Sequence, residues 1–158
     1  MRISHCQLAF ALSAVCTLSA QAGMITGYIT ADNHYALYTG SPDGAIVNFW
    51  GANEAGAGGA PGTYNWSSAE SYSVTSGDAY VYIAAWSDDS VAQGLLLDLV
   101  LNGDKVLSGD ASWQVWATGI DLDDGAPPPA IGTMMTQIAL ANSTGWESPF
   151  VGVANGAG

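Results

Sequence analysis

Carboxylates and aromatic rings are the side chains with which this 158-residue chain could do chemistry. It has fourteen Asp and Glu residues against two Lys and Arg residues, two histidines and two cysteines. Beyond residue 22 the remaining cation is Lys105, the remaining histidine is His34, and no cysteine is left. Nucleophilic, metal-binding and phosphate-binding sites mostly use His, Cys, Lys or Arg, so the composition disfavours these classes of site.

Two groups of acidic residues could bind a calcium ion, which prefers several oxygen ligands. One is the pair Asp88 and Asp89, which follows a predicted strand. The other group, just before Gly125, consists of Asp121, Asp123 and Asp124. The alternative is that these carboxylates are solvated turn residues, since Asp is common in turns. Calcium is therefore the one cofactor that the sequence suggests.

Glu54 and Glu70 are a conceivable acid and base for glycoside hydrolysis, which needs two carboxylates a few ångströms apart. Glu54 lies in a predicted loop and Glu70 begins a predicted strand, and nothing in the sequence brings them together. We therefore expect a protein without a catalytic site, and a small carboxylate-dependent glycosidase is the least favoured alternative.

Aromatic residues alternate along a predicted strand at 79–87. Strand side chains point to opposite faces in turn, so Tyr80, Tyr82 and Trp86 share one face. If exposed, these rings could stack on the apolar C–H faces of a sugar, together with Trp66 beside a Gly-rich loop. The alternative is that both faces of the strand are covered, which is usual for a run that is apolar on both sides.

Short apolar runs punctuated by Gly, Asn, Asp and Pro extend from Met24 to about Thr118 and predict antiparallel strands. Ser41-Pro42-Asp43-Gly44 predicts a tight turn, and Asn102-Gly103 predicts a hairpin. The Gly/Ala-rich stretch 52–62 predicts a surface loop. The expected strands are 24–30, 34–39, 45–51, 70–75, 79–87, 94–102, 105–108 and 113–118.

Residues 1–22 have the three-part pattern of a secretory signal peptide: Arg2, an apolar run at 8–18, and a small-residue cleavage pattern that ends at Ala22. We expect a β-sandwich domain at 23–118 and an acidic, Pro-rich linker at 119–130. The expected last segment, 131–158, contains a short amphipathic helix and reads as a truncated C-terminal part.

A net charge of −12 disfavours nucleic acid and anionic lipid as partners. No segment of the mature chain is long and apolar enough to predict a membrane span. Neutral glycans, matrix polymers or cations are the partners that we expect for a secreted protein of this charge.

Several short boxes resemble the galactose-binding-domain-like jelly-roll modules of secreted bacterial proteins. The first is Thr30-Ala31-Asp32-Asn33-His34-Tyr35-Ala36-Leu37-Tyr38, which is similar to the opening strand of those modules. The likeness covers about residues 26–118 and departs where Pro42-Asp43-Gly44 is inserted after the first such strand. The later boxes, in matching order, are Asn65-Trp66, Gly77-Asp78, Val81–Trp86, Gln93–Leu96 and Asp110–Val115.

This resemblance implies an all-β fold, an antiparallel jelly-roll β-sandwich, with the short helix added at the C-terminus. Related modules accompany secreted glycoside hydrolases, which implies a non-catalytic module that binds carbohydrate or extracellular matrix at the cell surface. The leader and the low Lys and Arg content are also similar to surface proteins that end in an exosortase (PEP-CTERM) sorting tail, which is absent here. The alternative is a structural or assembly module of a larger surface protein. It predicts exposed apolar side chains around Met134, Ile138, Trp146 and Phe150, and association that is lost when residues 127–158 are deleted.

Overall fold

The computed structural model describes residues 11–15, 23–53, 69–78, 80–86, 94–123 and 126–149, the first of these ranges by its backbone only. Eight of the strands in these ranges lie within a few residues of the predicted positions, and a further strand, β1, falls inside the predicted leader. The elements are β1 (Ala11–Val15), β2 (Gly23–Asp32), β3 (His34–Gly40), β4 (Val47–Ala52), β5 (Glu70–Ser76), β6 (Tyr80–Trp86), β7 (Gly94–Leu101), β8 (Asp104–Leu107), β9 (Trp113–Ala117) and α1 (Ile131–Thr144).

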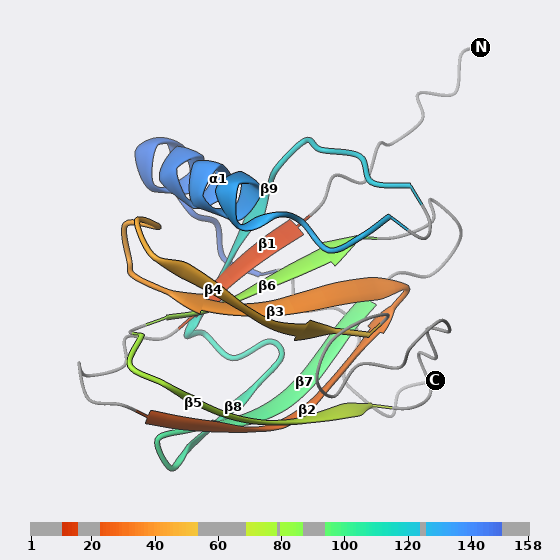
Figure 1. Cartoon of the computed structure of the whole chain (residues 1–158), viewed down its shortest axis with the longest axis vertical. Helices are drawn as coiled ribbons and strands as arrows, with labels where there is room; N and C mark the ends of the chain where they lie inside the picture. Colours follow the sequence, from red (N-terminus) through yellow and green to blue (C-terminus); the bar gives the residue numbers. More distant parts are fainter. Residues whose placement is uncertain are drawn as a thin grey trace.

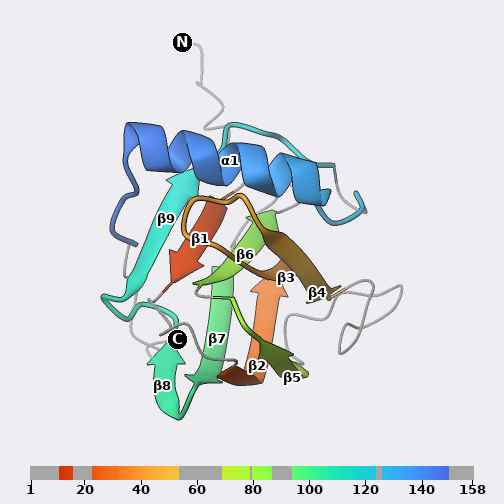
Figure 2. The same ribbon diagram turned by 60° about the vertical axis from the view of Figure 1, so that its left-hand side comes forward.

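The strands form two antiparallel sheets. One sheet has the order β4-β3-β6-β1-β9, and the other has the order β5-β2-β7-β8. The sheets pack face to face, and α1 lies across the outer face of the five-stranded sheet (Figures 1 and 2). Over the described ranges the protein is therefore an all-β sandwich with one short helix, in agreement with the predicted fold class at this level.

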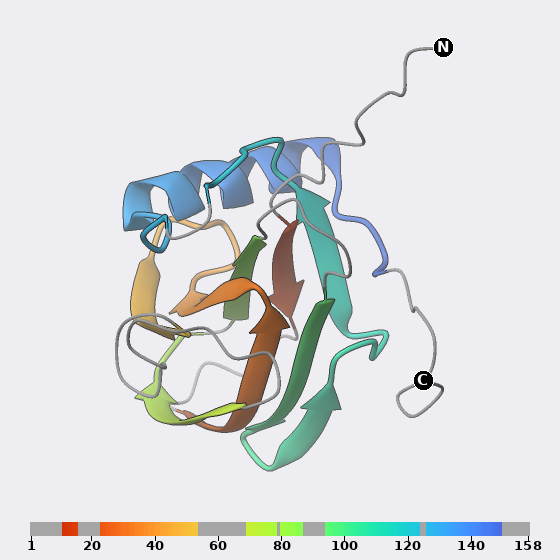
Figure 3. The ribbon, with the colours of Figure 1, turned by 90° about the vertical axis from the view of Figure 1, so that its right-hand side faces the viewer.

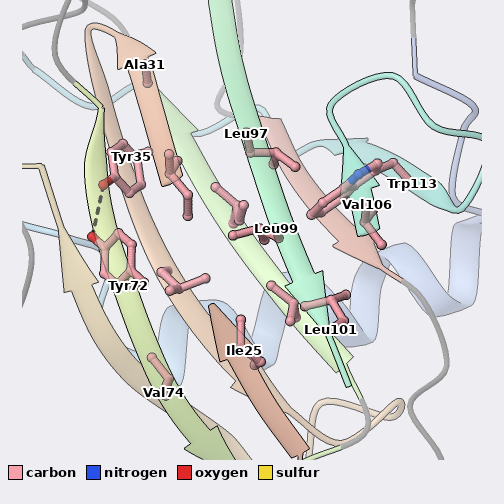
Figure 4. Packing of buried hydrophobic residues seen from close by; sticks show 14 residues of the cluster. Ile25, Ala31, Tyr35, Tyr72, Val74, Leu97, Leu99, Leu101, Val106 and Trp113 are labelled. Carbon is pink, nitrogen blue, oxygen red and sulfur yellow. Dashed lines mark hydrogen bonds between the residues drawn. The ribbon is translucent and has the colours of Figure 1, made fainter. Parts of the chain in front are cut away.

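The core between the sheets consists of the inward side chains of strands with alternating burial. In β2 the buried residues include Ile25 and Ile29, and in β7 they include Leu97 and Leu99 (Figure 4). A period of two places every second side chain on the inner face, so these residues pack against the facing sheet. The alternating pattern of the sequence thus identifies the face that each of these strands buries.

A second core lies between the five-stranded sheet and α1. Tyr38 of β3 and Tyr82 of β6 pack there with Met134 and Ile138, both fully buried. All seven residues of β3 are buried, because this strand is covered by the other sheet on one face and by α1 on the other. The assembly alternative predicts exposed side chains at Met134 and Ile138, and this is wrong for both, since α1 uses them to dock on its own sandwich. Trp146 is half-buried, and Phe150 lies outside the described residues.

The segment before α1 is tied to the sandwich rather than detached from it. The buried Tyr38 hydroxyl donates a hydrogen bond of 2.6 Å to the carbonyl oxygen of Pro129, and burial raises the pKa of Tyr38. The phenol therefore stays protonated and keeps donating. Because Pro129 lies two residues before α1, this hydrogen bond sets the point from which the helix crosses the sheet.

Both predicted turns are confirmed. The 41–44 turn is closed by a 3.0 Å hydrogen bond from the Gly44 amide to the Ser41 carbonyl oxygen, and Gly44 has a φ of 72°. Asn102 and Gly103 join β7 to β8 with φ values of 54° and 97°. Positive φ at both central residues is the geometry that favours Asn-Gly in two-residue hairpins.

Strand β1 occupies an inner position of the five-stranded sheet. It pairs with β6 on one side and with β9 on the other, over five residue pairs each (Figure 3). The sequence pattern of a leader does not predict a strand here. Among the described residues, no helix is long and apolar enough to cross a membrane.

Candidate functional site

The aromatic stripe of β6 is mostly interior. Tyr82 is 1% exposed and Trp86 is 6% exposed, and both belong to the core beneath α1. Trp86 stacks on the buried His34 ring, with centroids 5.2 Å apart. These two rings therefore do not form an exposed platform, which corrects the stacking hypothesis for them. Tyr80, at the start of the strand, is half-buried and remains accessible at the sheet end.

The other predicted ligand residues are partly beyond what the structure describes. Trp66, Asp88, Asp89 and Asp124 lie outside the described residues, as does Glu54. Asp121 and Asp123 are exposed between β9 and α1. Within the described ranges, no three His, Cys, Asp or Glu side chains lie close enough together to hold a metal ion.

Glu70 is buried at the start of β5, where a carboxylate would be costly without a partner. The Tyr35 hydroxyl donates to Glu70 Oε2 at 3.0 Å and is also hydrogen-bonded to the Tyr72 hydroxyl at 3.0 Å. Figure 4 shows the Tyr35–Tyr72 contact at the edge of the inner core. Burial raises the pKa of Glu70 and outweighs the opposing hydrogen bond from Tyr35. Glu70 is thus part of an interior polar cluster.

Asp78 follows β5 and is held by donors from three strands. Its Oδ2 accepts from the side chains of Asn48 at 2.9 Å and Ser76 at 2.8 Å, and from the Thr39 hydroxyl. Burial alone would raise the pKa of Asp78, but the three hydrogen bonds outweigh it and lower the pKa. This carboxylate joins the ends of β3, β4 and β5, so we assign it a structural role.

One hollow of about 370 Å³ combines aromatic rings with polar side chains, and we call it the Tyr80–Trp146 hollow. Four separate parts of the chain build it: the 41–46 turn, the start of β6, β9, and the end of α1 with the residues after it. Its described lining residues are Pro42, Asp43, Tyr80, Tyr82, Gln114, Asn142 and Trp146.

Hydrogen bonds within the chain hold the walls of this hollow in place. Asn142 Nδ2 donates to the Pro42 carbonyl oxygen at 2.9 Å, and Trp146 Nε1 donates to Asn142 Oδ1 at 2.8 Å. Asn142 therefore joins the turn, the helix end and the Trp146 ring. Tyr80 stacks on Tyr82 with centroids 6.1 Å apart and planes at 16°, so its ring is also supported from behind.

Asp43 supplies the charge of the hollow. Its Oδ1 accepts hydrogen bonds from the Ser41 hydroxyl at 2.5 Å and from the Ala45 amide at 3.0 Å. These two hydrogen bonds lower the pKa of Asp43, so it is ionised at neutral pH. With Gln114 on β9, the hollow offers a carboxylate and an amide beside two half-buried rings, Tyr80 and Trp146.

A second hollow of about 300 Å³ lies on the outer face of the four-stranded sheet beside Tyr28, which is 58% exposed. It offers one exposed ring, and its carboxylate, Asp98, is paired with Lys105 at 2.9 Å. The first hollow has two rings and a carboxylate, Asp43, which pairs with no cation of the described part of the chain, so it is the better candidate for a ligand site.

No protein-family model, curated protein or solved structure matches this chain. The choice between candidate sites therefore rests on their geometry and chemistry.

Sequence reasoning found Tyr80 and the 41–44 turn but not the hollow that they form. Trp146, Gln114 and Asn142 were not among the ligand candidates. Asn142 lies 100 residues from Pro42 in the sequence, and its amide side chain carries no signal that it bonds to that turn. The available hint was the large ring of Trp146 within a polar stretch that follows the predicted helix.

Proposed function

We propose that this chain is a secreted, non-catalytic module that binds neutral carbohydrate in the Tyr80–Trp146 hollow. The observation that carries the proposal is the pairing of two supported rings, Tyr80 and Trp146, with the Asp43 carboxylate and the Gln114 amide. Rings can cover the apolar C–H face of a sugar, while carboxylate and amide groups accept and donate hydrogen bonds to its hydroxyls.

Charge and size favour this class of ligand over others. A net charge of −12 and the ionised Asp43 repel anionic ligands such as nucleic acid or acidic polysaccharide. A volume of about 370 Å³ falls at the lower end of small-ligand pockets, which suits one or two sugar rings. The preferred ligand is thus an uncharged saccharide or the end of a neutral matrix polymer.

Binding is favoured over hydrolysis because the hollow lacks paired carboxylates among its described lining residues. Asp43 is the carboxylate there, whereas glycoside hydrolysis uses an acid and a second carboxylate across the bond. The resemblance to galactose-binding-domain-like modules supports the same assignment and adds a jelly-roll connectivity for the sandwich. The leader pattern supports secretion with cleavage after Ala22, followed by residence at the cell surface.

The test is a screen of neutral oligosaccharides against the chain with α1 retained, followed by isothermal titration of each hit. A version that ends at residue 118 would expose the core beneath α1 and lack Trp146, so it is unsuitable. Trp146→Ala should weaken binding at least tenfold, which corresponds to about 1.4 kcal/mol of lost ring contact. The matched control, Tyr28→Ala, removes an exposed ring from the other hollow and should leave affinity unchanged.

Equal losses in the two variants, or no binding by a protein with a cooperative thermal transition, would overturn the assignment. The titration is repeated with calcium and with a chelator, because Asp88, Asp89, Asp121, Asp123 and Asp124 are the calcium candidates. If the affinity depends on calcium, the ligand site also binds a calcium ion. If the affinity is unchanged, the hollow binds its ligand without a metal ion.

A further inference from the structure

The position of β1 has a consequence for the mature protein. Ala11–Val15 lies inside the segment that a secretory peptidase is expected to remove, yet it fills a place between β6 and β9 (Figures 2 and 3). The pairing is complete, from Ala11 opposite Ala85 and Ala117 to Val15 opposite Val81 and Trp113. Removal of this strand leaves β6 and β9 about 9–10 Å apart, which is two strand spacings.

Direct pairing of β6 with β9 would close such a gap only if side chains now packed on other elements moved. Trp113 of β9 is buried in the core between the sheets, and its Nε1 donates to the Leu107 carbonyl oxygen at 3.0 Å. On the other face, Trp116 Nε1 donates to Gln137 Oε1 of α1 at 3.1 Å. Val115 exchanges backbone hydrogen bonds of 2.8 and 2.9 Å with Glu147. These contacts hold β9 at its present distance from β6.

The two walls of the gap lack the charged residues and prolines that protect exposed sheet edges. Natural sheet edges carry charged residues, proline or bulges that prevent pairing with other chains. Among the outer strands, β5 and β8 follow this rule with Glu70, Asp104 and Lys105, and β4 has an irregularity in its pairing with β3. Residues 80–86 of β6 and 113–117 of β9 contain no charged residue and no proline. Walls of this kind are suited to a paired state and not to exposure.

We propose that, after removal of the leader, the gap between β6 and β9 is a strand-acceptor site for an extended, uncharged segment of another polypeptide. This inference rests on leader cleavage, which is part of the proposed function, and the gap adjoins the carbohydrate hollow. Tyr82 and Gln114 line that hollow, and both pair with Ala14 of β1. The incoming strand runs antiparallel to both walls, as β1 does, and gains backbone hydrogen bonds on both sides.

The surroundings of the gap define the chemistry of the segment that it accepts. On one face lie Val81 and Ile83, which belong to the core between the sheets. On the other face lie Tyr82 and Ala84, which belong to the core beneath α1. Side chains on both faces of the incoming strand are therefore placed beside apolar groups, where a charge would be costly. The accepted segment has about five apolar or small residues and no proline.

The experiment begins with the folded full chain, in which a specific protease site is placed within residues 16–22. After cleavage, the fragment that carries β1 is removed by size-exclusion chromatography. The probe is a fluorescent peptide with the sequence of residues 9–17, in which Cys16→Ser prevents oxidation. The control peptide also carries Ser13→Pro, because proline lacks the N–H group and disrupts pairing in an inner strand.

The expected result is saturable binding of the probe, at least tenfold tighter than binding of the proline control. Hydrogen exchange supplies the structural readout. The Val115 amide bonds to Glu147, so the amides of Gln114 and Trp116, which alternate with it, face the gap. Exchange at these two amides should be fast in the cleaved chain and slow again with the probe bound.

Four outcomes would overturn the proposal. Slow exchange of both amides after the fragment has left would show that β6 and β9 pair directly. Equal affinity for the two peptides, or a cleaved chain that unfolds and is not restored by the probe, would show that the gap does not select a strand. A stable dimer that excludes the probe would assign the gap to a second copy of this chain and not to another polypeptide.

Discussion

Docking of α1 on the sandwich is the packing interaction most open to a quantitative test. Ile138 is 0% exposed, whereas Ile131, the same residue type in the same helix, is 44% exposed. Ile138→Ala removes three carbon atoms, which at about 0.8 kcal/mol each amounts to about 2.4 kcal/mol of lost burial. The cavity left under the helix adds to this, and the better helix propensity of alanine returns about 0.4 kcal/mol. We expect a net loss of about 3 kcal/mol.

The assay is urea unfolding followed by tryptophan fluorescence, with the slope checked for each variant. Ile131→Ala should change the free energy of unfolding by less than about 0.5 kcal/mol, because its side chain buries little on folding. Similar effects of the two substitutions, or a loss below about 1 kcal/mol for Ile138→Ala, would refute the account of how α1 is held. A change in slope would show that α1 detaches before the sheets unfold.

Three further predictions concern polar groups. Asp78→Asn should lower the free energy of unfolding by about 2 kcal/mol at neutral pH, because the variant replaces hydrogen bonds to a charged acceptor with weaker ones. The pKa of Asp78 is lowered in the folded state, so the wild type loses this stability as the pH falls, and urea titrations should show a smaller cost of the substitution below about pH 4. Glu70→Gln should show the opposite pH dependence. The pKa of Glu70 is raised in the folded state, so the stability of the wild type decreases as the pH rises from 4.5 through that pKa. The melting temperature of the wild type should decrease over this pH range, and that of the variant should not. Tyr38→Phe leaves the buried Pro129 carbonyl oxygen without this hydrogen bond and should lower the free energy of chemical unfolding by about 1–3 kcal/mol. An unchanged unfolding midpoint would contradict the role of that hydrogen bond.

The sandwich was largely predictable because its strands follow local rules. Ile25, Ile29, Leu97 and Leu99 alternate with outward residues, and each strand is bounded by turn residues whose φ preferences are local. Both faces of β6 are covered, which is the alternative that the sequence allowed for its aromatic run, but the element that covers each face could not be identified in this way. Tyr82 is buried by a helix that begins at residue 131, and a strand that is apolar on both sides does not indicate which element covers which side.

The candidate site shows the same limit more strongly. Tyr80 and Asp43 are individually ordinary, a strand aromatic and a turn carboxylate. They line one hollow because Asn142 hydrogen-bonds to the turn and to Trp146 at once. Contacts between residues 100 positions apart depend on how the sheets and helix pack, which a single sequence does not encode in any local pattern.

The position of β1 also sets the order in which the five-stranded sheet can form during translation. Synthesis proceeds from the N-terminus, so Ala11–Val15 can pair with β6 only after residue 86 has been synthesised and with β9 only after residue 117. Pairings over such sequence distances form slowly, because the entropy cost of closing a long loop comes before the hydrogen bonds that compensate for it. Strand β1 therefore stays unpaired through most of synthesis. On the proposal that residues 1–22 are a secretory leader, late closure of the sheet leaves this segment accessible to the export machinery while the chain is being made.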